Sequence, residues 1–216
     1  MNKRLSISDC VAKIKDGMSV MIGGFMANGT PEGIIDALVA SGVKNLTVIC
    51  NDTGFPDKGI GKLIVNKQIK KIIVSHIGTN PVTVDQMNAG ELEVEFSPQG
   101  TLAERVRSGG AGLGGILTPT GIDTVVEKGK EKINIDGKIY LLELPLRADV
   151  ALLGANIGDK SGNLIFKGTS QNFNPIMAMA ADLVIAEIEK EVEIGELTPE
   201  TVHTPGIFVD WYCLKN

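Results

Sequence analysis

The chain has 216 residues, enough to bury a full hydrophobic core as one domain, and its 21 basic and 26 acidic residues give a formal charge of -5. Aromatic residues make up only 4% and no dense basic stretch occurs, which argues against a nucleic-acid-binding surface. Glycine accounts for 26 of the 216 residues, about 12% against a usual ~7%, which indicates many close backbone approaches.

The three cysteines, Cys10, Cys50 and Cys213, are widely spaced and form no Cys-x-x-Cys pair. This usage favours a reducing compartment over a disulfide framework or a zinc site. The two histidines lack metal-binding spacing, so we expect no metal site. The first residues contain no apolar signal core, and no apolar run approaches the ~20 residues of a membrane span. We therefore expect a cytoplasmic protein with one domain, residues 1–216.

The hydrophobic pattern alternates between helix and strand along the chain. Helices are expected from Ser6 onward, over 31–39, 61–65, 81–90 and 98–107, and from Asn174 onward. Strands are expected over 18–22, 46–50, 69–75, 92–96, 138–144, 150–153, 183–188 and 207–209. Strict alternation over 92–96 indicates a strand with one wet face, on which Glu93 and Glu95 are solvated. The alternation predicts an α/β fold, a mostly parallel sheet flanked by helices, with ligands at the carboxyl ends of the strands.

Helix beginnings carry a recurrent signal. Proline suits the first helical position, because no N–H is needed there, and a polar residue before it can cap the helix. Four helices are expected to begin with such a cap followed by proline, at Thr30, Asn80, Ser97 and Asn174.

Residues 16–31 contain a turn, a buried strand and the start of a helix, with Gly23, Gly24 and Gly29 between strand and helix. A glycine loop lets backbone N–H donors approach an anionic or carbonyl oxygen closely, and the positive end of the helix dipole faces the same place. The stretch also suits an ordinary tight connection that needs glycine for packing. The pattern alone does not decide between these two interpretations.

Residues 110–115, Gly-Ala-Gly-Leu-Gly-Gly, match the dinucleotide-binding fingerprint as a string. The fingerprint needs a strand before it and a helix after it, whereas here a helix precedes it and Leu-Thr-Pro-Thr-Gly follows soon after. We therefore reject NAD binding. A flexible glycine-rich loop beside a site is the better interpretation, with a purely structural loop as a close alternative.

Glu143 and Glu187 are the carboxylates with the most apolar neighbours in sequence. Each could be a tuned nucleophile, but a local ion pair at the end of a strand is the simpler interpretation. No nucleophile elbow, P-loop or His-Glu-x-x-His motif is present. The residues predict a ligand-binding α/β domain without a convincing catalytic group of its own.

Six segments carry a family resemblance. They are Asp-Gly, Val-Met-Ile-Gly-Gly-Phe and Gly-Thr-Pro within 16–31, Ser-Pro-Gln-Gly-Thr-Leu-Ala-Glu-Arg over 97–105, Gly-Gly-Ala-Gly over 109–112, Gly-Asn-Leu over 162–164, Asn-Phe-Asn-Pro over 172–175 and Thr-Pro-Gly-Ile over 204–207. Together they resemble the alpha subunit of family I coenzyme A-transferases over essentially the whole chain. The likeness is nearest to bacterial alpha subunits that act on acetoacetate with acetate or butyrate, and it implies a Rossmann-like CoA-transferase fold.

The family's second signature, a Ser-Glu-Asn-Gly with the nucleophilic glutamate, does not occur in these 216 residues. In the family it belongs to the beta subunit or to the C-terminal half of fused chains. The resemblance thus implies part of a hetero-oligomeric enzyme, with no catalytic residue here and the glutamate on a beta-subunit partner. The implied substrates are an acyl-CoA and a short-chain carboxylate, so coenzyme A is a substrate and no tightly bound cofactor is needed. The family signature places CoA or acyl contacts at Gly24, Phe25, Met26, Ala27, Asn28, Gly29 and Thr30.

Two other classes of function remain open on the residues alone. A sugar-phosphate isomerase could share this fold type, but it should carry its own acid–base pair, and none is evident. A non-catalytic domain that binds a sugar phosphate needs no nucleophile and stays compatible with the sequence.

Overall fold

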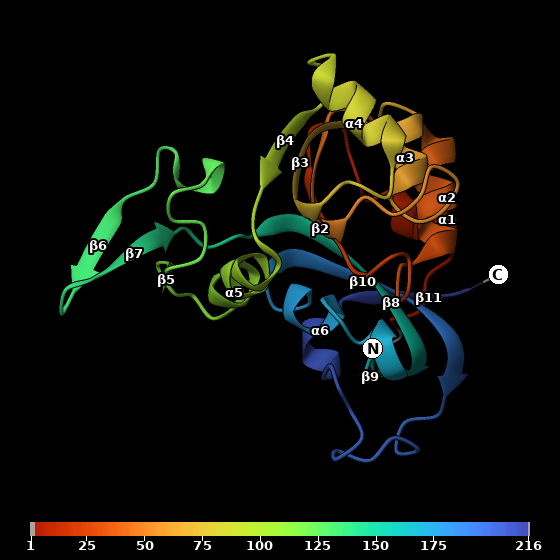
Figure 1. Cartoon of the computed structure of the whole chain (residues 1–216). Helices are drawn as coiled ribbons and strands as arrows, with labels where there is room; N and C mark the ends of the chain where they lie inside the picture. Colours follow the sequence, from red (N-terminus) through yellow and green to blue (C-terminus); the bar gives the residue numbers. More distant parts are fainter. Residues whose placement is uncertain (1–2, 216) are drawn as a thin grey trace.

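The computed structural model describes residues 3–215 and is built around a seven-stranded parallel sheet (Figure 1). From one edge to the other, its strands are β11 (Trp211–Leu214), β10 (Ala181–Val192), β8 (Ala148–Asp159), β1 (Ser19–Ile22), β2 (Leu46–Asp52), β3 (Ile69–His76) and β4 (Glu93–Phe96). Every neighbouring pair in this order is parallel, and the two-residue β9 (Leu164–Ile165) adds an antiparallel pairing to β8. The expected α/β fold is confirmed.

Helices cover both faces of the sheet. One face carries α1 (Ile7–Val11), α2 (Glu32–Ser41), α3 (Gly61–Val65) and α4 (Pro81–Asn88), and the other carries α5 (Gln99–Gly110) and α6 (Asn174–Met177) (Figure 1). Strand residues alternate between the two resulting cores: Val20 and Ile22 pack toward α1–α4, whereas Met21 packs toward α5 and α6. Burial on both faces explains why β1 reads as a continuous apolar run.

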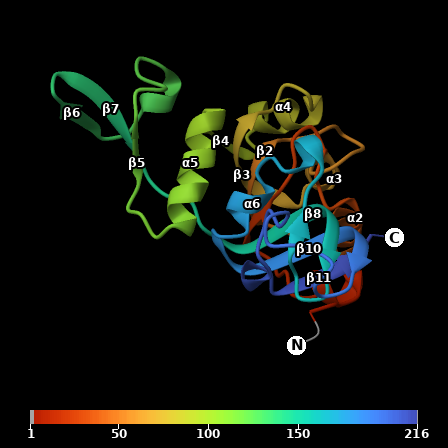
Figure 2. The same ribbon diagram turned by 90° about the horizontal axis from the view of Figure 1, so that it is seen from below.

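A second, three-stranded antiparallel sheet projects from the main body (Figures 1 and 2). It consists of β5 (Ile116–Thr118), β7 (Lys138–Glu143) and β6 (Lys132–Ile135), in that order. Sequence reasoning predicted a strand at 138–144 but neither of its partners. The missed signal is Asp136-Gly137, whose positive φ angles of 51° and 81° form the two-residue turn between β6 and β7.

A buried ion cluster joins the projecting sheet to α5. Glu143, at the end of β7, is 1% exposed and pairs with Lys130, while Arg105 Nε of α5 lies 3.8 Å from its second oxygen. Arg105 also pairs with Glu95 at 3.0 Å, and Lys71 pairs with the same glutamate at 3.1 Å. Glu143 therefore has the local pairing expected for it. The expectation of a solvated Glu95 was wrong, because β4 runs beside these two cations.

Only one of the four expected proline-linked caps exists. Asn80 accepts a hydrogen bond from Val82 N and caps α4. Thr30 instead donates to Gly23 O, Ser97 Oγ is buried without a partner among the described residues, and Asn174 lies inside its helix. In each failed case the tertiary environment, not the adjacent helix, decides what the polar side chain contacts.

The chain near the C-terminus also differs from expectation. The segment expected as a strand over 207–209 forms a 3₁₀ turn, η3 (Gly206–Phe208), which Pro205 precedes. Lys3 Nζ binds the carbonyl oxygens of Gly206 and Val209 at 2.6 and 2.7 Å, so these groups are not available to a sheet. Two further 3₁₀ turns, η1 (Val125–Glu127) and η2 (Gly168–Ser170), were not predicted.

Replacing Glu143 should separate the buried ion cluster from ordinary surface pairs. We expect Glu143→Ala to lower the free energy of unfolding by about 3 kcal/mol, because it removes the buried carboxylate that pairs with Lys130 and that Arg105 also faces. Glu104→Ala is the matched control, since Glu104 pairs with Arg107 on the exposed surface of the same helix, where a pair contributes about 0–1 kcal/mol. Denaturant unfolding of both variants measures the difference, and equal effects would contradict the prediction.

Candidate functional site

The first glycine loop, residues 23–30, lies where the strand order of the central sheet changes direction. It follows the carboxyl end of β1, whose two neighbours are β2 and β8. Later strands extend away from this point on both sides, to β4 through β2 and to β11 through β8. In an open α/β sheet, ligands bind at such a point, outside the carboxyl ends of the strands.

Close packing accounts for the glycines of this loop. A Cβ on Gly23 would lie 1.9 Å from Asn174 Oδ1, and a Cβ on Gly24 would lie 2.1 Å from Thr30 Oγ1. Gly24 (φ +130°) and Gly29 (φ +76°) also have backbone conformations that residues with side chains rarely adopt. The packing interpretation left open by the sequence is therefore sufficient for these glycines.

The tip of the loop has a strained backbone, although neither of its two central residues is glycine. Met26 (φ 50°) and Ala27 (φ 65°) form the turn between Phe25 and Asn28, whose backbone groups exchange hydrogen bonds of 3.0 and 2.9 Å. A turn with two left-handed central residues normally prefers Asn or Gly there. Because such conformations gather at ligand sites, the tip is a candidate ligand contact.

Asn172 fixes the loop from outside the sheet. Its Oδ1 accepts from Gly24 N at 3.1 Å, and its Nδ2 donates to Asn28 O at 2.9 Å. Gly24 N–H would therefore have to exchange acceptors to serve a substrate oxygen. The N–H groups of Ala27 and Gly29 have no acceptor among residues 3–215, so they can donate to a ligand.

Asn174 fixes the loop from beneath. This residue is fully buried, accepts from Gly154 N of β8 at 3.1 Å, and donates to the carbonyl oxygens of Gly29 and Ser170 at 3.0 and 2.9 Å. One amide thus joins β8, the glycine loop and η2. The Asn-Phe-Asn-Pro segment acts here as a clamp on the loop, a role that its helix-start pattern did not predict.

A second glycine loop, residues 54–59, repeats the pattern after β2. Both loops read Gly-Phe-x-x-x-Gly, and Phe55 pairs with Lys58 as Phe25 pairs with Asn28. Gly59 N donates to Glu32 Oε1 of α2 at 2.9 Å, which holds the second loop beside the first. The repeat was not predicted, although the shared string is visible in the sequence.

Asp52, at the end of β2, connects the two loops. Its carboxylate accepts from Met26 N of the first loop at 2.9 Å and from Gly54 N of the second at 2.9 Å. Asn51 Nδ2 donates to the same carboxylate at 2.8 Å, so three donors satisfy this buried charge. The paired loops therefore have a common anchor.

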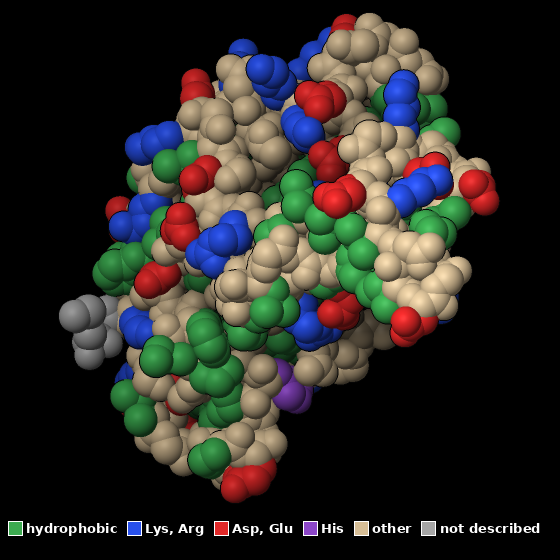
Figure 3. Space-filling view, turned by 90° about the vertical axis from the view of Figure 1, so that its left-hand side faces the viewer, with side chains coloured by type: hydrophobic (Ala, Val, Ile, Leu, Met, Phe, Trp, Pro, Cys, Tyr) green, Lys and Arg blue, Asp and Glu red, His purple; other side chains and the backbone are tan. Residues whose placement is uncertain are grey.

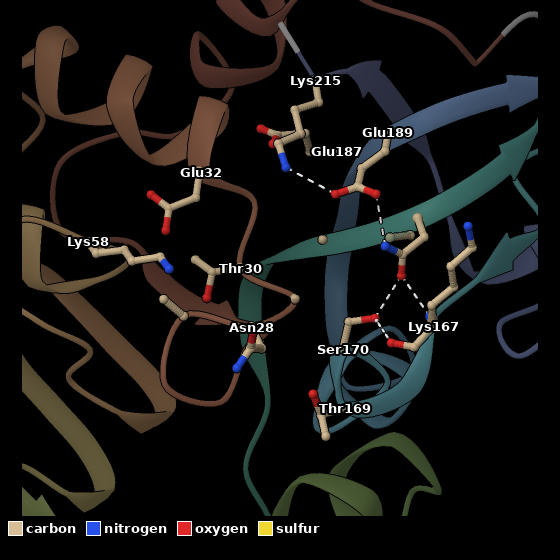
Figure 4. Close-up of a pocket in the computed structure, with 15 residues that line it drawn as sticks. Asn28, Thr30, Glu32, Lys58, Lys167, Thr169, Ser170, Glu187, Glu189 and Lys215 are labelled. Carbon is tan, nitrogen blue, oxygen red and sulfur yellow. Dashed lines mark hydrogen bonds and ion pairs between the residues drawn. The ribbon is translucent and has the colours of Figure 1, made fainter.

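A polar cavity of about 330 Å³ opens between the first loop, the second halves of β8 and β10, and the residue after β11 (Figure 4). Its lining residues are Ala27, Asn28, Gly29, Thr30, Glu32, Lys58, Gly154, Ala155, Asn156, Lys167, Thr169, Ser170, Glu187, Glu189 and Lys215. Four of the seven expected contact residues, Ala27, Asn28, Gly29 and Thr30, line it. Phe25 lines a separate cavity with Phe173 and Ile176, and Gly24 lies buried under the loop.

Sequence reasoning missed most of the remaining lining. Lys58 could have been found from the repeated Gly-Phe pattern, but Asn156, Lys167 and Lys215 come from separate elements that only folding brings together. The glycine segment 110–115 lines neither this cavity nor the Phe25 cavity. It leads from α5 into the projecting sheet, as expected of a structural loop.

Glu187 is the buried carboxyl group of the cavity wall. It is 3% exposed, and its Oε2 accepts from Ile34 N at the start of α2 at 2.7 Å. Burial raises the pKa of Glu187, and the hydrogen bond from Ile34 offsets only part of that rise. Glu187 thus serves a helix start that lacks a cap of its own.

Glu189 belongs to a chain of polar contacts along the opposite wall. Asn156 Nδ2 donates to Glu189 Oε2 at 2.9 Å and Lys215 Nζ lies 3.0 Å from Oε1; these contacts hold the pKa of Glu189 below its usual value. Asn156 Oδ1 in turn accepts from Lys167 N and from Ser170 Oγ, each at 2.7 Å (Figure 4). The wall is therefore preorganised.

The cavity offers backbone donors and cations but no assembled nucleophile. No cluster of three or more metal-binding side chains occurs within residues 3–215. In the same range no helix has the length and apolar character needed to cross a membrane. The face shown in Figure 3 mixes basic and acidic side chains. Chemically, the site can hold an anionic or carbonyl-bearing ligand.

A family model described as coenzyme A transferase matches residues 4–211. The chain belongs to the coenzyme A transferase family. It is 57% identical over 202 residues to the acetoacetyl-CoA:acetate/butyrate CoA transferase alpha subunit of Clostridium acetobutylicum, with 94% of this chain and 92% of that protein covered. It is 52% identical over 208 residues to the acetate CoA-transferase subunit alpha of Escherichia coli, with 96% and 94% covered.

A solved structure supports the CoA-transferase fold. An acyl-CoA transferase from Escherichia coli, in a thioester complex with CoA, superposes with a TM-score of 0.88 at 23% identity. The match covers 98% of the present chain and 46% of the chain of the solved enzyme. The present chain therefore spans about half the length of the solved enzyme. The expected fold and family are therefore confirmed.

Gly24→Ala tests whether packing or ligand contact decides the role of Gly24. We expect the free energy of unfolding to fall by about 1–3 kcal/mol, because the new Cβ meets Thr30 Oγ1 and the φ of +130° is unfavourable. Gly42→Ala is the control for backbone strain alone, since its φ is +71° and no atom lies within 4 Å of the new Cβ. Melting curves are measured beside the rate per folded complex. A normal melting curve with a rate reduced about 10²-fold would instead identify an oxyanion donor.

Glu187→Gln tests the consequence of the raised pKa. The folded chain binds the Glu187 proton more tightly than the unfolded chain, so this group's stabilisation is present at low pH and lost as the pH rises through the folded-state pKa. Glutamine keeps an acceptor for Ile34 N without the charge. The free energy of unfolding of the variant should therefore rise relative to that of the native chain as the pH increases from about 4.5, the ordinary glutamate pKa, through the raised folded-state pKa. Exposed Glu131→Gln is the control, and a gain that shrinks with rising pH would contradict the prediction.

Proposed function

We propose that this chain is the alpha subunit of a two-subunit CoA-transferase that moves CoA between a short-chain acyl-CoA and acetoacetate. The observation that carries the proposal is the match, over more than 90% of both partners, to alpha subunits named for acetate, butyrate and acetoacetyl-CoA. The geometry supports it, because the cavity offers backbone donors while its carboxylates Glu32, Glu187 and Glu189 are engaged by lysines or a backbone N–H. The family match leaves no specific support for a sugar-phosphate isomerase or a non-catalytic sugar-phosphate domain.

In this proposal, a beta subunit with a Ser-Glu-Asn-Gly motif supplies the reactive glutamate. The glutamate attacks the thioester of the acyl-CoA, giving an acyl-glutamyl anhydride and free CoA thiolate. The thiolate then forms a glutamyl thioester and releases the first carboxylate. The incoming carboxylate collects the CoA by the reverse steps, so the reaction is of the ping-pong type.

This chain would supply the environment in which those steps occur. Each attack places negative charge on a former carbonyl oxygen, and preorganised N–H donors stabilise that charge. Ala27 and Gly29 have N–H groups free for this purpose at the strained tip of the loop. We extend the contact to the whole segment from Gly24 to Thr30, with coenzyme A as a substrate and no tightly bound cofactor.

Two further features complete the proposal. Cys10, Cys50 and Cys213 are buried and unpaired in disulfides, which suits a reducing cytoplasm. The core on each face of the sheet contains residues from both halves of the sequence, which supports residues 1–216 as one alpha-subunit domain. A neighbouring reading frame with Ser-Glu-Asn-Gly would identify the partner.

The test is to assay the chain alone and after assembly with that partner. We expect no CoA transfer from acetyl- or butyryl-CoA to acetoacetate without the partner, because this chain lacks the glutamate motif. Transfer should appear on assembly, and competition among acetate, butyrate, succinate and 3-oxoadipate ranks the acids. Substantial turnover by the chain alone would overturn the two-subunit proposal, and Glu187→Gln would then show whether Glu187 is the nucleophile. A strong preference for a dicarboxylate would contradict the proposed substrate class, because no arginine lies in the first glycine loop to pair a second carboxylate.

A further inference from the structure

Two lysines flank the polar cavity from opposite sides without a carboxylate partner. Lys58 reaches in from the second glycine loop beside Glu32 and Thr30, and Lys167 lies across the cavity with Ser170 (Figure 4). We propose that Lys58 and Lys167 bind phosphate groups of coenzyme A. This proposal rests on the proposed function and names the part of the substrate that the cavity recognises.

The charges around the cavity separate into paired and unpaired groups. Glu32 pairs with Lys62 at 2.8 Å, and Glu189 pairs with Lys215 at 3.0 Å. Glu187 accepts a backbone hydrogen bond, and its raised pKa favours the neutral form relative to an exposed carboxyl group. Glu32 and Glu189 are therefore neutralised by lysines within the wall, and Glu187 is engaged by a backbone N–H.

Lys58 and Lys167 are not included in this neutralisation. Among residues 3–215, neither ammonium group has a carboxylate within 4.0 Å or a hydrogen-bond acceptor in the chain. Lys167 acts on Glu189 only through space, by contributing to the lowered pKa of that carboxylate. The unpaired charge at the cavity is therefore positive, in a chain whose formal charge is -5.

In both lysines the backbone N–H is held by a hydrogen bond, while the side-chain ammonium group has no partner among residues 3–215. Lys58 N donates to Phe55 O at 3.1 Å in the second loop, and Gly59 beside it is bound to Glu32. Lys167 N donates to Asn156 Oδ1 at 2.7 Å. Fixed attachment points reduce the entropy lost when the two side chains close on a ligand, and the flexible stems let each ammonium follow a phosphate.

Phosphate is the chemistry that fits these features. Lysine binds phosphate as a point charge, and a local cation pair can attract a polyanion that the net charge of the chain would repel. Ala27 and Gly29 line the same cavity, and their N–H groups have no acceptor among residues 3–215. A single carboxylate substrate would need only one of the two cations. Coenzyme A supplies both a diphosphate and a 3′-phosphate.

The experiment uses the assembled two-subunit complex with Lys58→Gln, Lys167→Gln and the double variant. We expect each single change to raise KM for acyl-CoA about tenfold, with kcat nearly unchanged, because each removes a charge-assisted contact. The double variant should also lose most of the salt dependence of KM. Lys70→Gln is the control, since it removes the same charge from an exposed position at the opposite, amino end of β3.

Substrate analogues identify the contact. Acyl-pantetheine has no nucleotide phosphates, so its KM should be the same for all variants. With acyl-dephospho-CoA, a lost response to one lysine assigns that lysine to the 3′-phosphate, and a retained response assigns it to the diphosphate. An equal rise in KM for acyl-pantetheine, or no rise for acyl-CoA, would overturn the proposal.

Failure of the proposed function has a different signature. If the native complex transfers no CoA, titration calorimetry with CoA still measures the lysines directly. Weaker CoA binding by the double variant than by Lys70→Gln would support phosphate recognition while removing the transferase assignment. Absence of CoA binding by the native complex would overturn both.

Discussion

The buried side-chain amide of Asn174 holds together the parts from which the site is made. It takes the place that a Cβ on Gly23 would need, and it binds β8 through Gly154 and the glycine loop through Gly29. A larger residue at 23 or an apolar one at 174 would leave strained or unpaired backbone groups beneath the loop. The glycines and the asparagine therefore depend on each other structurally, although about 150 residues lie between them in the sequence.

The general fold could be predicted because its signals are local. Apolar runs of strand length, helical spacing and glycine turns lie within single segments, and the burial of β1 on both faces is indicated by the consecutive apolar residues 20–22. The caps at Thr30, Ser97 and Asn174 failed because their side chains have distant or no partners. The site was predicted only where it coincides with the glycine loop.

Most of the remaining cavity lining has no sequence signal of its own. Apart from the place of Lys58 in the repeated Gly-Phe pattern, Lys58, Lys167 and Lys215 look like ordinary surface residues until folding brings the loop after β2, the segment after β9 and the end of β11 to one place. Their difference is electrostatic: Lys215 is neutralised by Glu189, whereas the other two are not. Such a distinction depends on which carboxylates lie within a few ångströms, and spacing along the chain does not contain that information.

The common anchor of the twin glycine loops has a mechanical consequence. Because one carboxylate, that of Asp52, holds Met26 and Gly54 together, and Glu32 holds Gly59, neither loop can swing independently without breaking charge-assisted bonds. The two loops therefore form one rigid unit and do not move as separate flexible loops. A bulky ligand would then enter the cavity through movement of the side chains that line it, or through rigid-body rotation of this chain relative to a partner subunit.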